Sequence, residues 1–192
     1  MSDNPESKQL VRRVKAGDTG AFQQLIEKYQ HLAFTVAFNI VKNREDAEEV
    51  VSDAFIKVYK NIVQHNEDSK FSSWLYKIVY NTALSRLRKK KIETYSIDAD
   101  AYEKDYGVNS PDGWDTLVSN DQKKYIQLAL EKLAEQDKLV LTLFYLAEEG
   151  LNEISEITRE KKSTVKVRLH RARTKLYNEL NVLLKNELTV LV

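Results

Sequence analysis

The sequence predicts an all-α protein built from two small helical domains that are joined by an acidic linker. Apolar residues recur at helical spacing over most of the 192 residues. Glycine and proline occur only 5 and 2 times, which is too few for the many turns of a β-sandwich or β-barrel. The charges nearly cancel, to a net +1, yet they are sorted along the chain. Sorted charge on a helical chain predicts distinct domains with different binding partners.

Charge divides the chain into three segments. Residues 1–91 carry a net charge of +5, residues 92–122 a net −7 and residues 123–192 a net +3. The middle segment also contains Gly107 and Pro111 and lacks sustained apolar periodicity. Because a structureless connection of about thirty residues is uncommon inside one compact domain, we interpret residues 92–122 as a linker. An irregular acidic loop on a single domain is the alternative.

The first domain is predicted to be helical throughout. A short helix covers about residues 10–16 and stops at Gly17, because glycine suits a helix end. Asn43, followed by two acids, predicts the start of a further helix. Three longer stretches each place their apolar residues on one helical face. The residues on these three faces are Phe22, Leu25, Ile26, Tyr29, Leu32, Ala33, Val36, Ala37 and Ile40; then Ala47, Val50, Val51, Ala54, Phe55, Val58, Tyr59 and Ile62; then Phe71, Trp74, Leu75, Ile78, Val79 and Leu87.

The second domain is also predicted to be helical. Two helices cover about residues 121–134 and 135–147, and a short helix follows at about 151–157. A longer helix comes next, and Ser163 or Thr164 is expected to cap its start. A short helix, a tight turn and a basic helix form the helix-turn-helix pattern of DNA-binding proteins.

The composition excludes several kinds of site. The chain has no cysteine and three widely separated histidines, so we expect no metal site. No nucleophile, base and orienting group come together, and we therefore expect no enzymatic activity, no cofactor and no small-molecule substrate. The first ten residues do not resemble a signal peptide, and no apolar run approaches the ~18 residues of a membrane span. We expect a cytoplasmic protein without direct membrane insertion.

Positive charge is concentrated in two places. Seven cations and no acid lie between Lys161 and Lys175, on a helix whose other face is apolar. Phosphate contacts release condensed counterions, and Arg and Lys also bind guanine edges, so this helix is a candidate for DNA binding. Five of the seven residues at 85–91 are basic and follow an aromatic-rich stretch. Cations beside aromatic rings suit unpaired bases, although cations at a helix end also simply complement the helix dipole.

Within that aromatic stretch, helical spacing separates a residue predicted to be buried from residues predicted to be exposed. Trp74 shares a face with apolar neighbours and is predicted to lie in the core. Tyr76, Tyr80 and Asn81 are the residues predicted to be exposed there.

Five acids are clustered on the helix that follows Asn43: Glu45, Asp46, Glu48, Glu49 and Asp53. They would repel DNA phosphates. Two interpretations stay open from the residues alone. The cluster is either a solvated face whose first acids complement the helix dipole or a docking surface for a basic partner protein.

These features together resemble the bacterial sigma factors of the extracytoplasmic-function type, which contain only regions two and four. The resemblance covers about residues 7–90 and 122–182 and rests on the blocks DAEEVV, F-x-x-WLY-x-I-x-x-N and TVK-x-RLHRAR in this order. It implies a helical bundle for region two, a helix-turn-helix for region four, and a protein that directs promoter-specific transcription initiation for a stress or envelope-signal regulon. The implied partners are core RNA polymerase (the β′ clamp helices and the β subunit), promoter DNA and, as in many members, an anti-sigma factor.

The resemblance also implies roles for individual residues. The residues implied for polymerase binding are Asp46, Glu49 and Asp53. Those implied for the minus-ten element, beside a loop at about residues 64–70, are Lys77, Tyr80, Asn81, Arg86, Arg88, Lys89 and Lys90. Those implied for the minus-thirty-five element are Lys162, Thr164, Lys166, Arg168 and Arg171.

Three positions depart from the family pattern. Arg159 and Glu160 stand in the turn of the helix-turn-helix, where a glycine and a hydrophobic residue are usual. Without glycine, a left-handed residue in that turn costs roughly 1 kcal/mol. Gly150 lies closer to the short helix than the pattern suggests, and Ser85 replaces an acid. The competing interpretations are a stand-alone helix-turn-helix DNA-binding regulator and a helical interaction protein.

Overall fold

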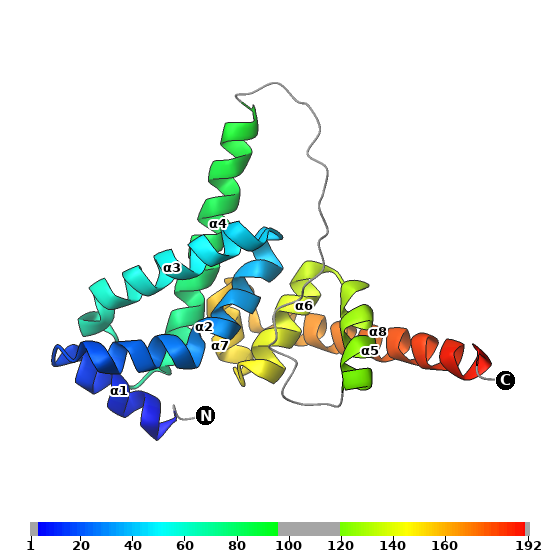
Figure 1. Ribbon diagram of the computed structural model, residues 1–192, viewed down its shortest axis with the longest axis horizontal. Helices are drawn as coiled ribbons and strands as arrows, with labels where there is room; N and C mark the ends of the chain where they lie inside the picture. Colours follow the sequence, from blue (N-terminus) through cyan, green and yellow to red (C-terminus); the bar gives the residue numbers. More distant parts are fainter. Residues whose placement is uncertain (1–3, 96–119, 191–192) are drawn as a thin grey trace. The chain divides into compact units, whose positions relative to one another are not determined.

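The computed structural model describes residues 4–95 and 120–190, with side chains described within 4–91 and 125–185. The chain divides into two compact units, Met1–Pro111 and Asp112–Val192. All regular structure in the described residues is helical, which confirms the predicted all-α class (Figure 1). Most of the predicted linker, residues 96–119, lies outside the described part.

The first unit is a helical bundle with α2 at its centre. Its elements are α1 (Pro5–Lys15), α2 (Thr19–Val41), α3 (Arg44–Asn61), the 3₁₀ helix η1 (Ile62–Gln64) and α4 (Phe71–Tyr95). Helix α2 packs against α1, α3 and α4, and α3 also packs against α4. Large side chains from all four helices are buried in the shared core, whose formation is driven by the removal of apolar surface from water. They include Leu10, Val11, Leu25, Val36, Val50, Phe55, Phe71 and Leu75.

Local chemistry explains where these helices begin. The side-chain oxygens of Asn4, Asp18 and Asn43 each accept a hydrogen bond from a backbone N–H in the first turn of α1, α2 and α3. The prediction for Asn43 is therefore confirmed. Helix α1 begins earlier than predicted because Asn4 caps it and Pro5 occupies its first position. Helix α4 continues to Tyr95, so the first residues assigned to the linker are helical.

The second unit is assembled on its last helix. Its elements are α5 (Asn120–Glu131), α6 (Glu135–Leu141), the π-helix η3 (Thr142–Leu146), α7 (Leu151–Thr158) and α8 (Lys162–Val190). Helices α5, α6 and α7 all pack against α8. The helix predicted at 135–147 is α-helical only to Leu141, because the backbone then widens into the π-helical turn. The buried residues include Leu141, Leu143, Ile154, Ile157, Val165 and Leu169.

The turn between α7 and α8 keeps a left-handed residue without glycine. Arg159 has φ +58°, and the hydroxyl of Ser155 donates to the carbonyl of Glu160 at 2.6 Å across the turn. The prediction that Ser163 or Thr164 caps α8 is wrong. The first helical hydrogen bond runs from the N–H of Val165 to the carbonyl of Lys161 at 3.0 Å, so the helix starts before either residue.

Candidate functional site

Asp46 is the centre of an ion-pair network that joins α3 to α4. Its side chain is 9% exposed and accepts hydrogen bonds from Arg86 Nε at 3.0 Å and Lys90 Nζ at 2.8 Å. Burial alone would raise the pKa of Asp46, but the hydrogen bonds from Lys90 and Arg86 outweigh it and hold the pKa below the ordinary 3.8. Asp46 is therefore charged at neutral pH and held within the unit.

The other two predicted polymerase contacts lie further along α3. Glu49 has a side chain that is 52% exposed and accepts a hydrogen bond from Arg86 Nη1 at 2.8 Å. Asp53 lies one turn further and is exposed, whereas Phe55 is buried, as predicted. The carboxylates of Glu49 and Asp53 are thus the accessible part of the predicted docking surface.

Helix α4 carries the residues predicted to contact the minus-ten element. Lys77, Tyr80 and Asn81 are half-buried, and the Asn81 amide donates to the carbonyl of Lys77 at 2.7 Å. Arg88 and Lys89 are exposed near the end of the helix. Arg86 and Lys90, as described, contact Asp46. Arg86 and Lys90 are therefore tied to α3 by ion pairs, although the Lys90 side chain is still 47% exposed.

The expectation that Tyr76 is exposed is wrong, because Tyr76 is only 1% exposed. Helix α4 packs against both α2 and α3, so a second face of the helix is buried beside the predicted one. Trp74 is half-buried and contacts the rings of Phe71 and His65, with centroids 6.1 and 4.9 Å apart. The prediction that Trp74 lies in the core is therefore only partly confirmed.

In the second unit, the start of α8 presents polar and cationic side chains to solvent. Lys162, Thr164 and Lys166 are all exposed. An open hollow of about 330 Å³ lies against the same part of the helix. Its lining residues are Ser163, Thr164, Val167, Arg168 and Arg171. The hydroxyls of Ser163 and Thr164 at this hollow can donate or accept hydrogen bonds.

Two of the five residues predicted for the minus-thirty-five element form ion pairs inside the unit. Arg168 Nη2 lies 2.8 Å from Glu160 Oε1 and its Nη1 lies 3.7 Å from Asp137 Oδ1. Arg171 Nη2 donates to the same Asp137 oxygen at 2.9 Å. Asp137 is 3% exposed, so it fixes α8 to α6 from a buried position.

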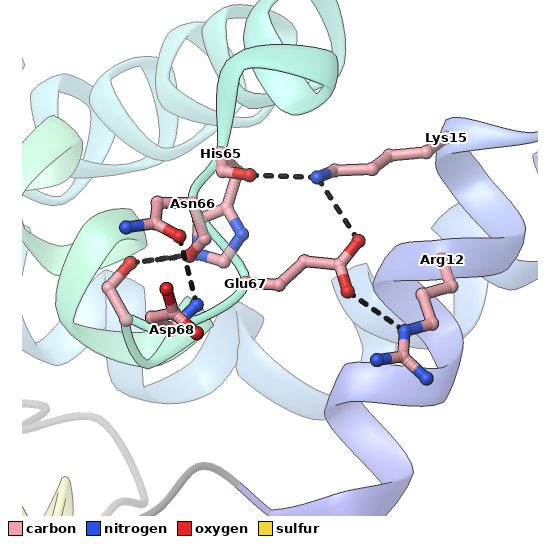
Figure 2. Close-up of polar contacts among 7 residues, drawn as sticks. Arg12, Lys15, His65, Asn66, Glu67 and Asp68 are labelled. Carbon is pink, nitrogen blue, oxygen red and sulfur yellow. Dashed lines mark hydrogen bonds and ion pairs between the residues drawn. The ribbon is translucent and has the colours of Figure 1, made fainter.

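A further polar cluster was not found from the sequence. Glu67, in the loop before α4, pairs with Arg12 and Lys15 of α1 (Figure 2). The partners are more than fifty residues apart along the chain. No local spacing signals such a contact, although the loop itself was recognised at residues 64–70.

The described residues offer neither a metal site nor a membrane-spanning helix. No group of three or more His, Asp or Glu side chains there is arranged to hold a metal ion. No described helix combines the length and the apolar character needed to cross a membrane.

Comparison with protein families gives two matches, one within each unit. Residues 25–92 match the model for sigma-70 region 2, and residues 123–176 match the model for sigma-70 region 4. The extracytoplasmic-function RNA polymerase sigma factor SigW of Bacillus subtilis strain 168 is 34% identical over 180 residues, which cover 90% of this chain and 96% of the relative. The sigma-E factor of Escherichia coli K12 is 30% identical over 193 residues, covering 96% of this chain and all of the relative.

Solved structures share the fold at lower identity. CnrH, in complex with the cytosolic domain of CnrY, has a TM-score of 0.59 at 19% identity and covers 92% of this chain and 98% of its own. The sigma factor RpoE of Bartonella quintana, in complex with the anti-sigma factor NepR, has a TM-score of 0.61 at 22% identity and covers 84% and 97%. Both comparisons support the helical architecture of the two units.

Proposed function

This chain belongs to the extracytoplasmic-function family of RNA polymerase sigma factors, which direct transcription initiation. We propose that separate charged surfaces of the chain bind core polymerase and the two promoter elements. Glu49 and Asp53 on α3 bind the β′ clamp helices of core polymerase, and Asp46 holds this helix against α4. The exposed cations of α4 contact the opened minus-ten strand. The start of α8 enters the major groove of the minus-thirty-five element.

The observation that carries this division is the opposite charge of two exposed helix surfaces in separate units. Glu49 and Asp53 are exposed carboxylates on α3, whereas Lys162 and Lys166 are exposed cations on α8. A carboxylate surface is repelled by DNA phosphates and is attracted to a basic protein, while the cationic one favours DNA. The match to sigma-70 region 2 at residues 25–92 also favours a sigma factor over a stand-alone DNA-binding regulator, which has no need for that region.

Joining the two DNA-binding units in one chain strengthens promoter recognition. Each unit alone contacts one short element, and the connection raises the effective concentration of the second unit once the first is bound. The acidic residues of the linker keep this connection away from DNA phosphates. We assign them to a positively charged channel of the polymerase, and we place the whole complex in the cytoplasm.

Run-off transcription with core polymerase, using a library of genomic fragments as template, tests the proposal. The wild-type chain should produce new transcripts that start below a shared two-block sequence. Asp53→Lys should weaken binding to core polymerase about tenfold or more, because it brings like charges together at the contact. Glu48→Lys is the matched control, since Glu48 pairs with Arg44 on a neighbouring face of the same helix.

The outcomes separate the candidate functions. Loss of polymerase binding in Asp53→Lys, with DNA binding retained, supports docking through α3. A wild-type chain that binds DNA but neither binds polymerase nor yields transcripts would instead be a stand-alone regulator. Equal losses in Asp53→Lys and Glu48→Lys would contradict the assigned docking face.

We also infer an anti-sigma partner and a stress or envelope-signal regulon. The two solved proteins of the same fold are each in complex with a second protein, CnrY in one and the anti-sigma factor NepR in the other. Such a partner would have to cover Glu49 and Asp53 to block polymerase binding. Core polymerase should then displace it from the wild-type chain, and Asp53→Lys should weaken both interactions.

A further inference from the structure

The loop between η1 and α4, residues 65–70, has a shape fixed by its own residues. The N–H of Asp68 donates to the side-chain oxygen of Asn66 at 3.0 Å, which closes a local turn. The N–H and hydroxyl of Ser69 both donate to the carbonyl of Asn66, at 3.0 and 2.8 Å. His65 is 5% exposed and lies 4.9 Å, ring to ring, from Trp74. The loop is therefore compact and has one end anchored in the core.

Two ion pairs and a hydrogen bond also connect this loop to α1. Figure 2 shows the Glu67 side chain reaching towards α1, where Arg12 Nε donates to it at 2.9 Å. Lys15 Nζ lies 3.5 Å from the other carboxylate oxygen and donates to the carbonyl of His65 at 2.7 Å. The hydrogen bond and charge of Arg12, with a smaller contribution from Lys15, lower the pKa of Glu67 below its ordinary value. The carboxylate is thus charged and turned towards α1.

Helix α1 is a firm support for these contacts. Leu10, Val11 and Val14 are each at least 94% buried, so the apolar face of α1 is anchored in the bundle. The hydroxyls of Ser7 and Tyr29 lie 2.7 Å apart and add a buried link to α2. Arg12 and Lys15 therefore project from a helix whose position is fixed.

We propose that Glu67, Arg12 and Lys15 are positioning residues that hold the loop at residues 65–70 in the conformation that reads the minus-ten element. The inference rests on the proposed function, because it assumes that this loop meets the opened DNA strand. An acid on a surface that approaches phosphates costs binding energy unless a cation neutralises it, and Arg12 and Lys15 supply that charge. With Glu67 turned towards α1, the exposed side chains of Asn66 and Ser69 are left to face the bases.

Fixing the loop in advance improves base selection rather than overall attraction to DNA. A loop that is already ordered keeps its hydrogen-bonding groups in one register, so a base that does not match that register leaves some of these groups unpaired. Removing the ion pairs of Glu67 should therefore reduce the preference for one base at the minus-ten element. Recognition of the minus-thirty-five element is proposed for the other unit and should be unaffected.

Holoenzyme assembled from core polymerase and each variant tests the inference on promoters randomised at the minus-ten element. The ratio of transcripts from the preferred to the next-best base should fall roughly three- to fivefold in Glu67→Gln, the size expected for losing partly exposed ion pairs. Arg12→Ala should lower the ratio similarly, and the double variant should fall no further than the larger single effect. Arg13→Ala is the matched control, because Arg13 lies on the same helix but pairs with Asp18.

Each result decides the matter. A wild-type ratio in Glu67→Gln, or losses that add in the double variant, would overturn the positioning role of Glu67 while leaving the proposed function intact. A wild-type holoenzyme with no base preference at the minus-ten element would overturn the proposed function and the positioning role together. An equal loss in Arg13→Ala would show that the ratio reports only on the stability of α1, which also overturns the positioning role.

Discussion

Each unit contains a buried aspartate that draws cations into ion pairs, yet the two differ in what they connect. Asp46 of α3 binds Arg86 and Lys90 of α4, and all three were predicted to contact polymerase or DNA. Asp137 of α6 binds Arg171 of α8, and Asp137 itself was assigned no functional role by the sequence. The first network joins two predicted binding surfaces, whereas the second joins a binding helix to its support.

This difference shows that a count of cations overstates the surface that is available to DNA. In the first unit, a change at the docking helix acts directly on the helix predicted to meet the DNA strand. In the second unit, Lys162, Thr164 and Lys166 lie before the ion-paired segment of α8 and stay exposed. DNA affinity in that unit should depend more on these residues than on Arg168 and Arg171.

The largest expected effect comes from neutralising each aspartate in turn. Asp46→Asn and Asp137→Asn should each destabilise their own unit by about 1–3 kcal/mol, because charge-assisted hydrogen bonds to a buried carboxylate are lost. Amide hydrogen exchange, resolved by residue, should show faster exchange in the affected unit only. Faster exchange in both units would mean that the units are not independent.

The effect of Asp46→Asn should also depend on pH. Because its folded pKa lies below the ordinary 3.8, charged Asp46 stabilises the fold at pH values above that point. The difference in unfolding free energy between wild type and Asp46→Asn should be constant from pH 7 to 5 and shrink as the pH falls below about 3.8. Urea unfolding at a series of pH values measures it, and a gap that widens in acid would contradict the network.

The recognition helix gives a smaller effect. Lys166→Ala should weaken DNA binding roughly fivefold and reduce the slope of log affinity against log salt by about one unit, as expected for a lost phosphate contact. Arg171→Ala should change the slope less, since its charge is already paired with Asp137. Fluorescence anisotropy over a salt series compares the two variants. Equal slopes would show that pairing with Asp137 does not reduce the contribution of Arg171 to DNA binding.

The sequence predicted the parts of this fold that depend on local pattern. The apolar stripes of α2 and α3, the Asn43 cap and the basic start of α8 are all local signals and are present, although Tyr59 on the α3 stripe is 48% exposed. Burial of Tyr76 depends on two helices packing against α4, and this is decided by the tertiary arrangement. The contacts of Asp46 with Lys90 and of Glu67 with Arg12 join residues 44 and 55 positions apart, so no spacing rule could find them.

The smallest expected effect concerns two of the left-handed non-glycine residues, one chosen from each unit. Arg159 has φ +58° and Lys42, which ends α2, has φ +60°. Replacing Arg159 by glycine should stabilise the second unit by about 0.5–1 kcal/mol, because glycine avoids the steric cost of this conformation but loses more chain entropy on folding. Lys42→Gly should gain less in the first unit, since the Lys42 ammonium also lies 5.8 Å from the centre of the Phe38 ring. Urea unfolding of both variants measures the two gains in unfolding free energy. An equal or larger gain for Lys42→Gly would show that this cation–π contact contributes nothing to stability.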